Sequence, residues 1–298
     1  MGWLQRPMMK RLFRYAGLVL AFGAAGVSAQ VPDPAAAPAQ QYQALLKEFS
    51  AAAPNYFQTT NVAERQAMVA RVDKVTVKLM DFLEQHPKEP FALEGLTQVI
   101  TMEYWLNNHT QHPGWGTNSP QAKAITQLLR DHLQSDQLVE TCKRVNFGFR
   151  QECETFLRTV LEKNPHRDVQ GAACLRLAQL LAGRVEKLDV LKDQPELIRR
   201  YEGLFGKDFI QELQRRDQGA VMKEAEALYE KARDKYGDVK LPWDETVGQV
   251  AARDLNEIQY FAVGKVAPEL KGEDQNGQPL ALSAYRGKVV LLYFWTEY

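Results

Sequence analysis

VGKVAPELKGEDQNGQPLALSAYRGKVVLLYFWTEY, residues 263–298, is the stretch that decides how this chain is organised. Nearly all of the preceding sequence has the apolar spacing of α-helices, whereas here the period falls to two and then becomes a continuous apolar run. Asn276-Gly277 lies in a predicted turn, because both residues tolerate a positive φ. Residues 268–271 and 278–282, on either side, are the predicted strands of a hairpin.

After the hairpin, Ser283 can cap a single helical turn that Gly287 ends. Residues 288–295, KVVLLYFW, then have apolar side chains on both faces, which is typical of a central strand in a covered, largely parallel sheet. A lone strand of this kind can neither satisfy its backbone nor bury both faces. We therefore expect that an α/β domain begins in this stretch and is incomplete at residue 298.

The stretch resembles the thioredoxin-like redoxin family, of the TlpA and AhpC/TSA type. The resemblance covers about an eighth of the chain and rests on the order and spacing of GKVAPE (264–269), GED (272–274), NG (276–277), LS (282–283), YRGK (285–288) and VVLLYFW (289–295). It implies that the strand runs into a short loop and that the nucleophilic cysteine of Cys-x-x-Cys comes four residues after Trp295. The given chain therefore ends one residue short of that cysteine and contains no catalytic residue. The residues that would flank the active site are Trp295, Thr296, Glu297 and Tyr298.

The resemblance implies that the complete protein is an exported thiol–disulfide oxidoreductase: a thiolate attacks a substrate disulfide, and a second cysteine resolves the mixed disulfide. Its partners would be a disulfide-containing substrate and a thiol electron donor, with no cofactor and no metal. A helix N-terminus would favour the thiolate, whereas the Glu297 carboxylate would raise the pKa of that thiol. Two alternatives stay open, namely an antioxidant AhpC/TSA-type thiol peroxidase that takes a peroxide, and a non-enzymatic helical-repeat interaction module in which the redoxin segment is vestigial.

Composition and charge are those of an ordinary globular protein. Lys plus Arg and Asp plus Glu both number 37, so nothing indicates a nucleic-acid partner. Residues 1–29 have a basic start, a short apolar run and a small-residue cleavage pattern, which predict a secretory signal, a periplasmic or cell-envelope location and no membrane span after cleavage. Residues 30–41, rich in Pro and Ala, are expected to be a flexible linker.

Residues 42–262 are predicted to be α-helical almost throughout. FLEQHP (82–87) recurs as VLEKNP (160–165), and each copy is expected to end a helix. This weak repeat favours a helical-hairpin array similar to tetratricopeptide repeats, with an irregular helical bundle as the alternative. The helical domain would bind a protein partner or position the redoxin domain.

The chain contains three cysteines, none of them in Cys-x-x-Cys. Cys142 and Cys153 lie on apolar stripes of neighbouring predicted helices, where they could form a disulfide or be two buried hydrophobic residues. Cys174 is expected in the core. His109 and His112 lack a helical frame and a third ligand, so a solvated loop is favoured over a metal site. Trp105 and Trp115 flank the same loop and could cover a peptide groove, although simple packing is favoured.

Overall fold

The computed structural model describes residues 37–110, 116, 118–146, 148–192, 194–242, 245–261 and 265–293. The predicted signal, residues 1–29, and residues 30–36 of the predicted linker lie outside these ranges. Among the described residues, no helix is both long enough and apolar enough to cross a bilayer.

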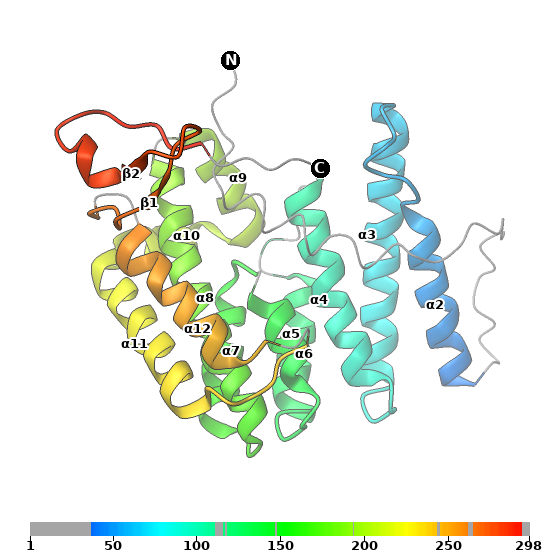
Figure 1. The fold of residues 1–298 in the computed structure, drawn as a ribbon. Helices are drawn as coiled ribbons and strands as arrows, with labels where there is room; N and C mark the ends of the chain where they lie inside the picture. The colour runs from blue at the N-terminus through cyan, green and yellow to red at the C-terminus, as the bar shows by residue number, and fades with distance from the viewer. Residues whose placement is uncertain are drawn as a thin grey trace.

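Helices form nearly all of the described chain before residue 262 (Figure 1), as the apolar spacing predicts. They are α2 (Pro38–Ala52), α3 (Val62–Gln85), α4 (Ala92–His109), α5 (Pro120–Asp131), α6 (Leu138–Asn146), α7 (Gln151–Lys163), α8 (Arg167–Lys192), α9 (Pro195–Phe205), α10 (Lys207–Arg215), α11 (Gln218–Tyr236) and α12 (Val247–Asn256). A π-helical turn, Glu257–Phe261, continues α12. The prediction of a mainly α-helical protein is therefore confirmed.

A local capping residue fixes the start of α5. The Ser119 side chain accepts a hydrogen bond from the Ala122 N–H (3.0 Å), and a proline occupies the first turn of α5. The predicted linker, residues 30–41, extends too far, because α2 already begins at Pro38. A helix accepts proline in its first turn, and the alanine and glutamines that follow are good helix formers.

Helix α8 is the centre of the helical domain. Of its 26 residues, 15 are buried and lie around the helix rather than along one stripe, and it packs against α6, α7, α9, α11 and α12. Gly171 allows α11 to approach closely, since a Cβ at this position would lie 2.9 Å from the Cβ of Tyr236. This half of the domain is therefore a bundle around one central helix.

The apolar residues of the helical domain form one main core and smaller clusters. The main core draws on α2 to α8, α11 and α12. Helices α9 and α10 instead bury their apolar side chains in a separate cluster with the C-terminal end of α8, consisting of Leu188, Leu191, Phe209, Ile210 and Leu213. We refer to residues 195–215 as the α9–α10 hairpin, and it is attached to the domain outside the main core.

The C-terminal segment contains the only β-sheet in the described chain, and this sheet has two strands (Figure 1). Strands β1 (Lys271–Glu273) and β2 (Pro279–Ala281) pair antiparallel, with Gly272 opposite Leu280, and a 3₁₀ turn (Leu282–Tyr285) follows. The predicted hairpin and helical turn are therefore present. The predicted strand at 288–295 is wrong for its described part, residues 288–293, which pair with no strand. A strand needs a neighbour for its backbone hydrogen bonds, and β1 and β2 pair only with each other in the part of the chain that is described.

Candidate functional site

The hairpin turn of the C-terminal segment is held by the Asp274 side chain. Its carboxylate accepts hydrogen bonds from the backbone N–H groups of Asn276 (2.8 Å) and Gln278 (2.9 Å), which form an Asx-type turn. Gly277 has φ +74°, a conformation that glycine adopts without strain. These interactions are local, so the turn is determined by its own sequence.

A second set of contacts ties the 3₁₀ turn back to the start of the segment. The backbone N–H of Ser283 donates to Oε1 of Glu269 (3.0 Å), and the backbone N–H of Leu282 donates to the carbonyl of Leu270 (2.9 Å). Hydrogen bonds from Ser283 hold the pKa of the Glu269 carboxyl below its ordinary value. The predicted side-chain cap at Ser283 is absent from the 3₁₀ turn, and Ser283 instead holds Glu269 through both its side chain and its backbone N–H.

The apolar run after the 3₁₀ turn is exposed. Val289 is fully exposed, and Leu291 and Tyr293 expose 88% and 82% of their surface. Contiguous exposed apolar side chains are uncommon on soluble proteins and indicate a surface that another element covers. The predicted flanking residues Trp295, Thr296, Glu297 and Tyr298 lie outside the described residues.

Cys142 and Cys153 are both free and buried, so the structure contains no disulfide between them. Cys142 lies in the main core with Leu138 and Val145 of the same helix. Cys153 belongs to the same core, and its sulfur faces Gln121 Oε1 (3.9 Å) and packs against Gly148, where a Cβ would lie 2.3 Å from it. The two thiols therefore act as small buried hydrophobic groups, the second interpretation that the sequence allows. Cys174 is buried in the same core, as predicted.

Burial also makes these thiols unreactive. It raises the pKa of Cys142 and Cys153 from 9.0 to about 12 and that of Cys174 to about 11, because a thiolate is poorly solvated in an apolar core. Since the thiolate is the nucleophile in disulfide exchange, the helical domain provides no redox centre among its described residues.

The same pKa shifts predict a loss of stability in alkali. A thiol whose pKa is raised on folding contributes stability that is complete below its unfolded pKa, near 9, and is lost as the pH rises toward its folded pKa of about 11 to 12. We expect the free energy of unfolding, measured with urea, to fall between pH 8.5 and 10.5. Replacing all three cysteines by alanine should make the free energy of unfolding fall less steeply with pH. Part of the fall should remain, because burial also raises the pKa of Tyr229. An equal slope in both proteins would contradict the assignment.

A buried ion pair that sequence reasoning missed joins α4 to the start of α7. Glu103 is 0% and Arg150 is 1% exposed, and Nη2 of Arg150 lies 2.7 Å from Oε1 of Glu103. Oε2 of Glu103 accepts the N–H of Gln121 (2.8 Å) in the first turn of α5, and Nη1 of Arg150 donates to the carbonyl of Gly116. The pair thus connects α4, α5 and α7 by charge-assisted hydrogen bonds.

A second ion pair lies between α7 and α8. Arg184 donates to Oε2 of Glu154 and to the carbonyls of Phe149 and Arg150. Burial acts to raise the pKa of the Glu154 carboxyl, but Arg184, Arg158 and Arg216 outweigh it and lower this pKa. Both carboxylates are therefore engaged by arginines that fix the helices, which indicates a structural role.

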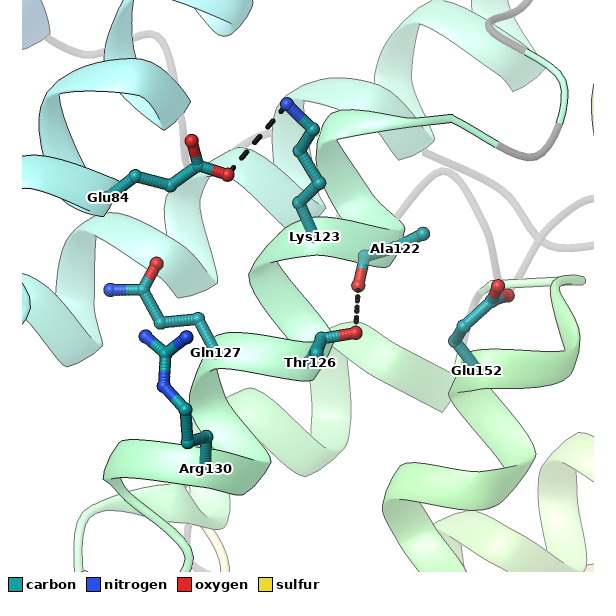
Figure 2. Close-up of a pocket in the computed structure, with 7 residues that line it drawn as sticks. All are labelled: Glu84, Ala122, Lys123, Thr126, Gln127, Arg130 and Glu152. Atoms are coloured by element: carbon teal, nitrogen blue, oxygen red, sulfur yellow. Dashed lines mark hydrogen bonds and ion pairs between the residues drawn. The ribbon is translucent and has the colours of Figure 1, made fainter.

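A shallow hollow lies on the outer face of α5 (Figure 2). Its volume is about 500 Å³, and it is lined by Glu84 from α3, five residues of α5 and Glu152 from α7. Nζ of Lys123 lies 3.7 Å from Oε1 of Glu84, and both side chains are more than 40% exposed. Arg130 pairs with the adjacent Asp131. The lining is therefore part polar and part apolar, and its two cations, Lys123 and Arg130, are each paired with a carboxylate.

The remaining sequence candidates do not form a described site. His112, Trp115 and the side chain of His109 lie outside the described residues. Trp105 packs edge-to-face on Tyr56 with ring centroids 5.0 Å apart, which is the packing role favoured from the sequence. No group of three or more metal-binding side chains occurs within the described part of the chain.

Comparisons with protein-family models, with curated proteins and with solved structures give no match. The candidate site therefore rests on this chain alone, and the described feature that points to function is the C-terminal segment, residues 265–293.

The buried ion pairs had no clear sequence signal, because an arginine or glutamate between helices usually lies at the surface.

Proposed function

We propose that the chain belongs to an exported thiol–disulfide oxidoreductase of the redoxin type, in which the helical domain binds or positions a partner. The observation that carries the proposal is the order of elements in the C-terminal segment: a hairpin with an Asp274-stabilised turn, a 3₁₀ turn, and then the exposed apolar run at 289–293. This order matches the resemblance in the sequence, and the exposed run has the composition of an inner strand that a complete α/β domain would cover.

The chemistry requires cysteines that this chain does not supply. In the complete protein, a thiolate attacks one sulfur of a substrate disulfide and releases the other as a thiol. The second cysteine then attacks the mixed disulfide, which frees the reduced substrate and leaves a protein disulfide for an external thiol donor to reduce. Cys142, Cys153 and Cys174 are unsuited to this role because they are buried and their pKa values are raised.

The test is to read the gene beyond codon 298 and to assay the extended protein. We expect a cysteine at the first new codon and a second one three codons later, and we expect the extended protein to reduce a disulfide substrate with a thiol donor. Replacing the first of these cysteines by serine should abolish the activity, whereas replacing the three buried cysteines should leave most of it. Another residue at the first codon would refute the exchange mechanism, and a single cysteine within Pro-x-x-x-Thr-x-x-Cys would favour the thiol peroxidase.

The second candidate is a non-enzymatic helical interaction module, similar to helical-hairpin repeats. It is favoured by the two related segments in the sequence, since α3 and α7 end at Gln85 and Lys163, within the repeated motif, and a helix follows each. The central position of α8 argues for a bundle over a regular array. Affinity capture from an envelope extract should retain the same partner with the full chain and with a variant lacking residues 265–298. Retention of no partner by either protein would count against it.

A further inference from the structure

The α9–α10 hairpin lies over the two buried ion pairs. The Phe205 ring of α9 is 5.4 Å from the guanidinium carbon of Arg150, and the Phe209 ring of α10 is 5.5 Å from that of Arg184. Arg150 and Arg184 are only 1% and 4% exposed. Two aromatic rings of the hairpin therefore contribute to the cover that keeps these guanidinium groups away from water, by a cation–π arrangement.

The hairpin is held differently from the other helices. Its apolar side chains form the separate cluster with the end of α8, and none of them enters the main core. Its polar attachments include two arginines and Gln218 of α11, whose Nε2 donates to the carbonyl of Leu213 (2.8 Å). Nη2 of Arg200 donates to the carbonyls of Asn107 (3.0 Å) and Thr110 (2.9 Å) at the end of α4, and Nη1 of Arg216 donates to Oε2 of Glu154 (3.2 Å).

The hairpin rejoins α11 through a short extended junction that the Gln218 side chain bridges by hydrogen bonds to the carbonyls of Leu213 and Arg216. Arg216 and Asp217 both have extended backbone angles, and the helical hydrogen bonds of α10 end at the N–H of Arg216. Opening at this junction would break the small cluster, the arginine contacts and the hydrogen bond from Gln218 to Leu213, while the backbone hydrogen bonds of α8 and α11 remain intact. Units with few apolar contacts open at a lower free energy than the core to which they attach.

We propose that the α9–α10 hairpin is a cover that opens as a unit while the main core stays folded, and that opening exposes the Glu103–Arg150 and Glu154–Arg184 pairs. The inference goes beyond the proposed function and does not depend on it. Arg200 holds the hairpin closed, because its two hydrogen bonds join the middle of α9 to carbonyls at the end of α4, which lie 93 and 90 positions earlier in the sequence.

Hydrogen exchange of the full chain, followed by mass spectrometry, tests the proposal. In the wild-type protein, we expect amides of α9 and α10 to exchange at least tenfold faster than amides in the middle of α8. The variant Arg200→Gln loses two charge-assisted hydrogen bonds, so exchange in the hairpin should rise about tenfold more with no change in α8. Arg233→Gln, which removes an exposed pair with Asp234, is the matched control and should change neither rate.

The proposal is overturned if the hairpin and the middle of α8 exchange at the same rate in the wild-type protein, because both would then open only by global unfolding. It is also overturned if Arg200→Gln accelerates both regions equally while the protein stays folded. The wild-type comparison decides the question even if the variant does not fold.

Discussion

Replacing Glu103 by glutamine is expected to lower the free energy of unfolding by about 3–5 kcal/mol. Arg150 is 1% exposed and lies 2.7 Å from Glu103 Oε1, so the substitution leaves its positive charge buried without a counterion. Glutamine has nearly the same shape, but when its oxygen accepts the N–H of Gln121 its NH2 group faces the Arg150 donors, so the change removes both the negative charge and the acceptor of Arg150. Urea unfolding at pH 7, followed by circular dichroism, measures the effect.

Two further variants separate burial of charge from loss of packing. Glu224→Gln removes a partner of Arg158 where both side chains are more than 40% exposed, and it should cost less than about 1 kcal/mol. The double variant Glu103→Gln with Arg150→Met also removes the buried positive charge, so it should be more stable than Glu103→Gln alone. The explanation fails if Glu103→Gln costs no more than Glu224→Gln.

The second large effect is expected in α8. Leu175 and Leu177 are two residues apart, so their side chains point about 200° apart around the helix. Both are at most 1% exposed. Leu175→Ala and Leu177→Ala should each cost about 2–5 kcal/mol, because each leaves a cavity in the main core. A surface helix with one apolar stripe would show a large effect for one of them only.

Val77→Ala in α3 is the control for these two substitutions. Val77 is 38% exposed, so its truncation should lower the free energy of unfolding much less than either α8 substitution does. Urea unfolding under the same conditions measures all three. A cost below 1 kcal/mol for either leucine would show that α8 is not enclosed on both sides.

Most helices could be predicted from the sequence because their signals are local. The apolar stripe in α11, the cap at Ser119 and the breaks near Pro87 and Pro165 depend on residues three to seven positions apart. The same is true of the turn at Asp274 and Gly277, where side-chain hydrogen bonds and a positive φ determine the conformation. These elements need no distant partner to be recognised.

The predicted inner strand failed because it depended on a distant partner. Residues 288–293 have the composition of an inner strand, but a strand forms only beside another, and the described residues offer none. For Cys142 and Cys153 the sequence left open a disulfide or two buried hydrophobic residues, and only helix packing decided for the second. The start of α2 was placed too late because composition alone does not separate a Pro/Ala-rich linker from a proline-initiated helix.

The sequence by itself determined the helical class, most helix positions, the hairpin turn and the resemblance to redoxins, because each depends on short-range spacing and on residue types. Only the tertiary structure decided that α8 is central, that Glu103 meets Arg150 across 47 positions, and that the α9–α10 hairpin covers this pair. The physical reason is that burial and pairing of charges arise when separate helices pack, and no local pattern encodes which face of one helix meets which face of another.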